Sequence, residues 1–269
     1  MGAPELTRAR SVSTRAYDTY AAVYAARLDP TLAAAAARVA ELTDARPGTR
    51  VLDVATGTGS AAQAVAGRGA SVVAIDSSPG MLDVARRLAP ELDFRRCDAH
   101  ALPFSDASFD AATCGLSLSH FGGRETALRE ILRVVRPGGR FVASAWGEGS
   151  RFPTGIIDEL LDRYGAPSPL SAELDEKTWL SPERGSSALR GAGFADVSVI
   201  TEFYAGEFAH ANEAVGWSLG WPLTASRVAQ LDPGRRERLH RESVEALADA
   251  NLSWRFAFNF YLASKAPLA

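Results

Sequence analysis

The chain of 269 residues has little of what marks secreted, membrane or metal-binding proteins. Its two cysteines, Cys97 and Cys114, are too few and too far apart for a disulfide framework or a zinc cluster, so we predict no metal site. No run of 18 apolar residues occurs, and the N-terminal segment lacks the apolar core of a secretory signal. We therefore expect a cytoplasmic protein with no membrane partner.

The net charge is also small, at −3, and the pI is about 5.9, so no strongly basic surface is indicated. Proteins that bind nucleic acids neutralise phosphates with basic surfaces, so we expect no nucleic-acid partner. Lysine occurs only at positions 177 and 265, whereas Arg, Ala and Gly are abundant, which is typical of a GC-rich bacterial genome. We expect a monomer or a homodimer that acts on a small molecule.

The middle of the chain, residues 45–146, alternates short apolar runs with amphipathic segments. Such alternation predicts parallel strands joined by right-handed helical crossovers, the doubly wound, Rossmann-like α/β class. Continuous apolar runs such as VVAI indicate strands buried on both faces. The predicted strands are 50–54, 71–75, 92–96, 109–115 and 140–145, and the predicted helices are 60–67, 79–88 and 124–135.

The flanking regions predict additions to this core within a single domain, residues 1–269. Residues 11–45 indicate two cap helices that separate near Asp29-Pro30, because proline is tolerated in a first helical turn. Two insertions, at about 150–180 and 206–250, interrupt the end of the sheet. Helices at 155–164 and 182–192 and strands at 197–203 and 253–264 complete the prediction.

The sharpest motif is VLDVATGTG at residues 51–59, an apolar strand that runs into a glycine-rich turn and then a helix. Glycines there allow a tight bend and a close approach of the backbone to a ligand. An acid, Asp76, ends the second strand 17 residues after Gly59, where a carboxylate can accept both hydroxyls of a ribose. Both features also fit a dinucleotide-binding reductase, so these two motifs leave that alternative open.

Three further features favour S-adenosyl-L-methionine (SAM) over a dinucleotide. Asp53 stands inside the first strand, where it could meet the ammonium group of a methionyl tail. Asp98, in CDAHALPF, ends a third strand and can accept the exocyclic amine of adenine. Finally, LRVVRPGGRF at 132–141 is a helix stopped by Pro-Gly-Gly before another strand.

Together these segments resemble the class I SAM-dependent methyltransferase family, of the ubiquinone/menaquinone methyltransferase-like type that acts on small molecules. The resemblance is carried by VLDVATGTG, VVAIDSSPGML, CDAHALPF, FDAATCGLSLSHF and LRVVRPGGRF, and is strongest over residues 45–146. It implies a mostly parallel seven-stranded sheet whose last strand is antiparallel, and S-adenosyl-L-homocysteine as product.

The resemblance also implies roles for individual residues. The methionyl end of SAM would be held by Asp53 and the turn, the ribose by Asp76, and the adenine by the third strand end. The carbonyl of Cys114 would face the SAM ammonium, and Tyr17 and Tyr24, in YDTYAAVY, would either close over SAM or pack on the sheet. The full predicted cofactor set is Tyr17, Tyr24, Asp53, Ala55, Thr56, Gly57, Gly59, Asp76, Ser77, Met81, Asp98, Ala99 and Cys114.

The acceptor side is less well marked. His120 follows the fourth strand and is the leading candidate for a general base, since an unperturbed histidine titrates near pH 6.5; shaping the pocket or capping the next helix is the alternative. His100 is expected near adenine. Phe152, Trp179, His210, Trp217 and Trp221 are candidates for an apolar acceptor site, with core packing as the alternative.

The predicted activity is methyl transfer to a small, fairly apolar metabolite, with oxygen favoured over carbon or nitrogen, possibly in natural-product tailoring within secondary metabolism. One alternative is a SAM-binding enzyme of the same fold that does not methylate, such as a pericyclase or cyclase. A scaffold without catalysis has no need for carboxylates at three strand ends. The motif of Asp/Asn-Pro-Pro-Tyr, which marks methylation of adenine or amide nitrogens, is replaced by Cys114-Gly115-Leu116-Ser117.

Overall fold

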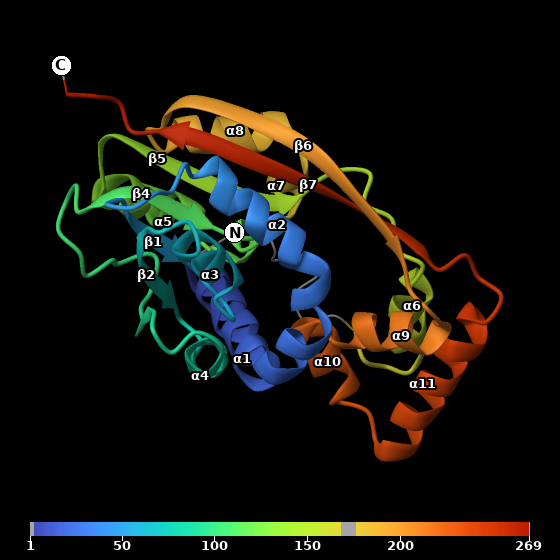
Figure 1. Ribbon diagram of the computed structural model, residues 1–269. Coiled ribbons are helices and arrows are strands. Elements are labelled where there is room, and N and C mark those ends of the chain that lie inside the picture. Colours follow the sequence, from blue (N-terminus) through green and yellow to red (C-terminus); the bar gives the residue numbers. More distant parts are fainter. Residues whose placement is uncertain (1–2, 168–175, 269) are drawn as a thin grey trace.

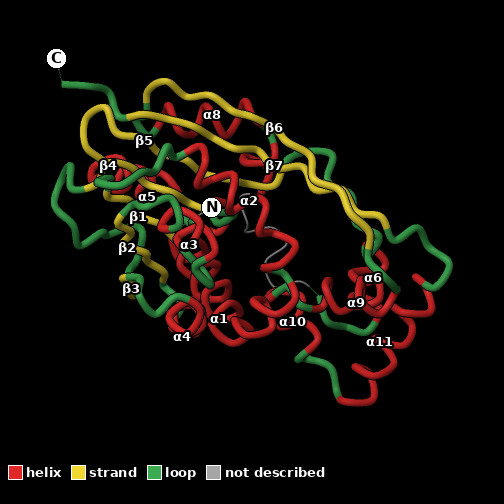
Figure 2. The backbone as a smooth tube through the Cα atoms, in the orientation of Figure 1, coloured by secondary structure: helices red, strands yellow, loops and turns green. Residues whose placement is uncertain are grey.

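The computed structural model describes residues 3–167 and 176–268, which form a twisted sheet between layers of helices (Figures 1 and 2). In this part of the chain the sheet has seven strands in the order β3-β2-β1-β4-β5-β7-β6. The strands are β1 (Arg50–Val54), β2 (Ser71–Asp76), β3 (Asp93–Arg96), β4 (Phe109–Cys114), β5 (Val135–Trp146), β6 (Ala195–Glu207) and β7 (Ser253–Ser264).

The pairing of the strands confirms the predicted fold class. Strands β1 to β5 pair in parallel, and β7 pairs antiparallel with both β5 and β6. The strand order reverses at β1, which pairs with β2 on one side and with β4 on the other. In open α/β sheets a ligand binds at the carboxyl ends of the strands beside such a reversal.

The strand β5 begins earlier than the sequence predicts, so the predicted start at residue 140 was wrong. The Pro-Gly-Gly segment was expected to end a helix and precede a strand at 140–145, but the helix ends at Val134 and β5 begins at Val135, opposite Phe109. The register of β4 against β5 shifts between Phe109 and Ala111, and Gly138 has a φ of +74°. The glycines thus form a bulged start of the strand.

Helices cover both faces of the sheet. On one face lie α2 (Asp29–Leu42), α3 (Ser60–Ala66) and α4 (Pro79–Leu88), and on the other lie α5 (Arg124–Val134), α7 (Glu176–Leu180) and α8 (Pro182–Gly191). The helix α4 has the start that its sequence predicts, because the Ser78 hydroxyl accepts from the backbone N–H of Met81 and Pro79 follows the cap. The helix α1 (Ala3–Arg27) packs against α4 and α2 and lies over the carboxyl ends of the strands.

The helices near the C-terminus form a separate layer at the far end of the long β6–β7 hairpin (Figure 1). There α11 (Pro233–Leu247) packs against α6 (Gly155–Arg163) and α9 (Ala211–Leu219). The helix α10 (Pro222–Val228) instead packs on α1, so one insertion reaches the cap. None of the described helices is long and apolar enough to cross a membrane.

Candidate functional site

A cavity of about 590 Å³ opens where the strand order reverses, beneath the cap helices. Its walls come from parts of the chain that are distant in sequence: the cap helices, the turn after β1, the ends of β2 and β3, the segment after β4, the end of β5 and the start of α10. The cavity is therefore assembled by the topology at the place where doubly wound sheets bind ligands. Side chains or backbone of these segments face the cavity at Ser13, Tyr17, Tyr24, Asp29, Ala55, Thr56, Gly57, Thr58, Ser60, Asp76, Ser77, Met81, Asp98, Ala99, His100, Gly115, Ser117, His120, Trp146 and Trp221.

The glycine-rich turn after β1 bends the chain under the cavity. Ala55, Gly57 and Gly59 all have positive φ, of 53°, 57° and 87°. The turn is tied to the next strand by the backbone N–H of Thr56, which donates to the carbonyl of Ile75 over 2.9 Å. Gly59 does not line the cavity; a Cβ there would lie 3.1 Å from the Phe94 ring. The predicted turn residues therefore divide into those that face a ligand and one that permits close packing.

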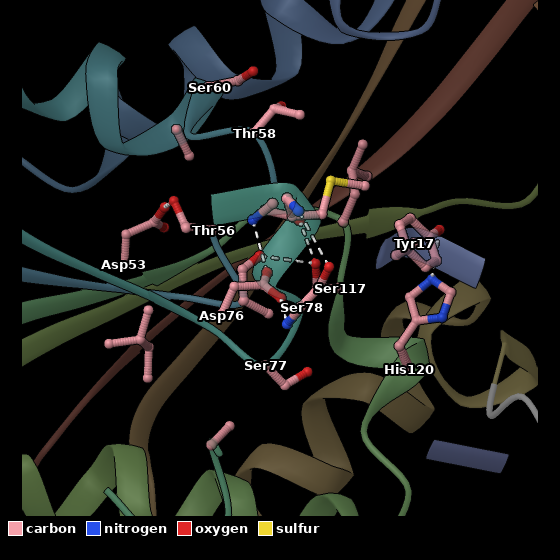
Figure 3. A pocket seen from close by; sticks show the side chains of 18 of the residues that line it. Tyr17, Asp53, Thr56, Thr58, Ser60, Asp76, Ser77, Ser78, Ser117 and His120 are labelled. Carbon is pink, nitrogen blue, oxygen red and sulfur yellow. Dashed lines mark hydrogen bonds between the residues drawn. The ribbon is translucent and has the colours of Figure 1, made fainter. Parts of the chain in front are cut away.

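The carboxylate of Asp76, at the end of β2, faces the cavity and is held by the backbone. One oxygen accepts from the N–H of Gly57 over 2.9 Å and the other from the N–H of Ser78 over 2.8 Å (Figure 3). Burial raises the pKa of Asp76, and the backbone hydrogen bonds from Ser78 and Gly57 limit that rise. A carboxylate fixed in this way still has lone pairs for the two vicinal hydroxyls of a ribose.

Asp53 borders the cavity but has no accessible surface. Its oxygens accept hydrogen bonds from the hydroxyls of Thr56, over 2.5 Å, and Thr113, over 2.6 Å. Burial raises the pKa of Asp53 to about 6, opposed by the hydroxyls of Thr113 and Thr56. The side chain thus joins β1, the turn and β4 at the edge of the cavity, and its contact with a ligand ammonium stays a prediction.

The end of β3 and the start of α4 form the opposite wall. Met81 is buried beside Ala21 and Val84 and presents an apolar surface, while Ala99 lines the cavity next to Asp98. One oxygen of Asp98 lies 2.7 Å from Nδ1 of His100, and Nε2 of that ring lies 2.7 Å from the carbonyl oxygen of Gly122. His100 therefore links this wall to the segment after β4, and its place near adenine stays a prediction.

The cap helix α1 closes the cavity with aromatic and hydroxyl side chains. The rings of Tyr17 and Tyr24 lie 5.9 Å apart, and Tyr24 is so enclosed that burial raises its pKa well above the ordinary value. The hydroxyl of Thr14 lies 3.3 Å from that of Ser77. Of the two alternatives for the tyrosines, closing over a ligand or packing on the sheet, the cavity-lining position favours the first.

His120 lies in a short 3₁₀ turn after β4, directly under α1. Its Nδ1 lies 3.2 Å from the hydroxyl of Ser13 and its Nε2 lies 3.3 Å from the hydroxyl of Tyr17 (Figure 3). Burial lowers the pKa of His120 to about 4, so the imidazole is neutral at pH 7. A neutral ring can accept a proton, so His120 stays a candidate base, but a pKa of about 4 makes it a weaker base than an ordinary histidine.

Four of the five predicted acceptor-site residues do not line the cavity. Trp179 is buried on the opposite face of the sheet against Tyr261, and Trp217 is packed in the core with its Nε1 donating to the hydroxyl of Thr31. His210 caps α9 through Nδ1, which accepts from the N–H of Glu213. Phe152 stacks on Trp217 outside the cavity. These four predictions are corrected to packing and capping roles, and Trp221 remains.

Cys114 also lies behind the wall, where Gly115 takes its place in the lining. Its side chain points into the core shared with α5, and burial raises the pKa of its thiol. No group of three or more His, Cys, Asp or Glu side chains that could hold a metal occurs among the residues described.

Two of the lining residues that sequence reasoning missed bear directly on the chemistry of the cavity. Trp146, at the end of β5, packs edge-on against Trp221 at 5.9 Å and extends the aromatic wall. Asp29, noted only as the point where two helices separate, brings a carboxylate into the cavity from the first turn of α2. A strand-end aromatic and an acid before proline are common patterns, so neither carries a signal that could have singled it out.

The residues present fit SAM, the cofactor implied by the sequence. The bent turn offers backbone to a methionyl tail, Asp76 offers lone pairs to a ribose, and Met81, Asp98 and Ala99 offer an apolar wall with an acceptor edge to adenine. A cavity of about 590 Å³ lies within the range of small-molecule and cofactor pockets in general.

Comparisons with known proteins agree with this assignment. Residues 52–143 match the model of a methyltransferase domain. The chain is 48% identical over 106 residues to the demethylmenaquinone methyltransferase of Renibacterium salmoninarum, covering 39% of this chain and 45% of that protein. It is 41% identical over 167 residues to the demethylmenaquinone methyltransferase of Clavibacter sepedonicus, covering 56% of this chain and 67% of the relative.

The similarity does not extend over whole relatives, since the chain spans about half the length of several that it matches. Among solved structures, a [4+2]-cyclase is 25% identical with a TM-score of 0.52, covering 88% of this chain and 82% of that one. The sheet order, the residues at the strand ends and the extent of the match to the Clavibacter protein together lead to one conclusion. The chain belongs to the class I SAM-dependent methyltransferases, of the quinone methyltransferase type.

Proposed function

We propose that the protein transfers a methyl group from SAM to a small, flat, largely apolar acceptor of the quinone or phenol type. The observation that carries this proposal is the continuity of one cavity, in which a cofactor end built by Asp76 and the glycine-rich turn joins an aromatic end built by Trp146 and Trp221. The relatives named demethylmenaquinone methyltransferases support a ring of the quinone class. Oxygen remains the favoured acceptor atom.

When bound, SAM supplies a methyl group on a positively charged sulfur, which is transferred by in-line displacement. The residues of the chain supply alignment and exclude water, and such alignment is worth up to roughly 7–11 kcal/mol in the best intramolecular models. Asp76, Ser77, Met81, Asp98 and Ala99 orient the nucleoside. Tyr17 and Tyr24 close the cavity from α1.

A base is needed only where the acceptor must lose a proton, as a phenol or hydroquinone must. We propose His120 for this role, because its ring is neutral at pH 7 and borders the cavity. An acceptor hydroxyl would take the place of the Tyr17 hydroxyl on Nε2. His120→Asn should then lower kcat by roughly a hundredfold or more while the affinity for SAM is retained.

We propose a single domain in which residues 45–146 bind the cofactor. The cap helices at 11–45 and the insertion that contains α10 would select the acceptor, since Trp221 at the start of α10 reaches the cavity. The insertion at 150–180 would affect acceptor selection only by packing against the residues that line the cavity.

Formation of S-adenosyl-L-homocysteine tests the proposal. The protein is incubated with SAM and a panel of hydroquinones, phenols, amines and acidic carbon acids, and the product is quantified by mass spectrometry. Product that depends on a phenolic or hydroquinone acceptor is expected. Product only with amines would contradict the oxygen assignment. SAM that binds but yields no S-adenosyl-L-homocysteine with any acceptor would favour the non-methylating, cyclase-like alternative, which the 25% identical cyclase structure brings into consideration.

A further inference from the structure

One acidic side chain in the cavity has no role in the family resemblance. Asp29 lies in the first turn of α2, at the corner between the two cap helices. It lines the cavity at the end where Thr58 and Ser60 of the glycine-rich segment face it. Figure 3 shows Thr58 and Ser60 on the turn and the start of α3, above Asp76 in this view and well apart from His120.

The charge of Asp29 is not balanced within the protein. Burial raises the pKa of its carboxyl, and only the neutral hydroxyls of Thr58 and Ser60 oppose that rise. Within the part of the chain that the structure describes, no Arg, Lys or His side chain forms an ion pair with it. A carboxylate that is partly withdrawn from water is ordinarily paired with a cation or held by several donors, so the half-buried Asp29 is suited to a cation that arrives with a ligand.

The neighbours of Asp29 indicate which cation. Thr58 and Ser60 belong to the turn that offers its backbone to the methionyl tail, whereas the nucleoside end lies at Asp76, Met81 and Asp98. The methionyl tail of SAM ends in a primary ammonium. Asp53, the other acid near this turn, is fully buried and already accepts from two threonine hydroxyls.

We propose that Asp29 binds the primary ammonium of the methionyl tail of the cofactor. A carboxylate on the cap helix then binds the amino-acid end, while groups at the strand ends of the sheet bind the nucleoside. The inference rests on the proposed function in so far as SAM is the cofactor. Because the ion pair joins the cofactor to α2, bound cofactor also fixes the α1–α2 corner over the cavity.

The test is calorimetric binding of four ligands to the wild type and to Asp29→Asn. SAM, S-adenosylhomocysteine and decarboxylated SAM all carry the ammonium, whereas 5′-methylthioadenosine has neither the ammonium nor the carboxylate. Asp29→Asn should weaken the first three by roughly tenfold to a hundredfold, the range for hydrogen bonds to charged groups, and leave 5′-methylthioadenosine within about twofold. Asp76→Asn, the nucleoside-end control, should weaken all four.

Decarboxylated SAM separates the two charges of the tail. If Asp29 faced the ligand carboxylate instead, its removal would strengthen the binding of SAM and leave decarboxylated SAM unchanged, and that pattern would overturn the inference. Equal losses for all four ligands would also overturn it, because they would indicate a general distortion of the cavity. Wild-type protein that binds none of the four would overturn the cofactor assignment itself.

A second readout needs no ligand. Partial burial raises the pKa of Asp29 and so disfavours its charged form in the free protein, and Asp29→Asn should therefore have a melting temperature at pH 7 equal to or above that of the wild type. If the role of Asp29 were only to hold the cap through Thr58 and Ser60, the melting temperature would fall and the binding of all ligands would weaken together.

Discussion

The two ends of the cavity are built in different ways. At the cofactor end the groups that the sheet contributes stand at strand ends, one or two residues from a buried apolar run, as Asp76 does at the end of β2. At the acceptor end they come from helices and from the far end of β5, as Trp221 and Trp146 do. The first set is positioned by sheet register and the second by packing between α1, α10 and the hairpin.

This difference matters for function because the two ends tolerate change differently. A strand end is fixed on both sides by ladder hydrogen bonds, and the Asp76 carboxylate is held further by two backbone N–H groups. The acceptor end can be remodelled by moving one helix without touching the sheet. One cofactor can therefore be kept while the acceptor varies. Substitutions at one end of the cavity should change binding at that end and leave binding at the other end unchanged.

The largest effect is expected where the cap rests on α4. A Cβ on Gly80 would lie 2.2 Å from the carbonyl oxygen of Asp18 and 3.0 Å from its Oδ1, so Gly80→Ala must push α1 away. Overpacking of this kind costs about 1–3 kcal/mol, and displacement of the cap should weaken SAM binding as well. Urea unfolding and calorimetry measure the two effects. Gly155→Ala, where the added methyl meets nothing within 4 Å, is the matched control.

Unchanged stability in Gly80→Ala would mean that α1 does not depend on its contact with α4, and the cap would no longer be part of the cofactor end.

The next effect belongs to the acceptor end. Trp221→Ala removes one side of the aromatic wall, so KM for the acceptor should rise about tenfold while the affinity for SAM stays within about twofold. Trp179→Phe is the control, because Trp179 lies in the core on the other face of the sheet and should lower stability without changing KM. A shift in KM caused by Trp179→Phe but not by Trp221→Ala would reverse the assignment of the acceptor site.

The smallest effect is the pH dependence of the free energy of unfolding that His120, which borders the cavity, contributes. The folded pKa of His120 is about 4, below the value of about 6.5 of an unfolded histidine. The unfolded state therefore binds more protons below pH 6.5, and the stabilisation present above that pH is lost as the pH falls toward 4. Between pH 7.5 and pH 6 the wild type should lose about 1 kcal/mol relative to His120→Asn.

Comparison with His120→Asn removes the opposite contribution of Asp53, whose pKa is raised to about 6. Urea unfolding at the two pH values gives the difference directly. Parallel behaviour of the two proteins would show that the His120 ring is as accessible to protons in the folded state as in the unfolded state.

The same contrast explains what could be predicted from the sequence. The helix at Pro79–Leu88 was predicted at its observed bounds because its cap, proline and apolar spacing all lie within one short segment. The predicted residues Asp76, Met81 and Asp98 do line the cavity, because each lies at or a few residues beyond the end of a strand whose position the sheet fixes. Trp179 and Trp217 were misplaced because whether an aromatic faces a cavity or a core depends on helix packing, which no local pattern encodes.

Asp29 was missed for a related reason. Its significance comes from Thr58 and Ser60, about thirty residues away, and from the absence of a cationic neighbour among the described residues, neither of which can be seen in the chain around position 29. The early start of β5 follows from pairing between Val135 and Phe109, a tertiary contact that overrides the helix-stopping character of Pro-Gly-Gly.

Isothermal titration of SAM and S-adenosyl-L-homocysteine into the wild type and Asp76→Ala tests the cofactor assignment most directly. Micromolar binding of both ligands to the wild type is expected, weakened at least tenfold in Asp76→Ala because two ribose hydroxyls lose their acceptor. Absence of binding to a wild-type protein verified as folded, or equal binding by the two proteins, would contradict it.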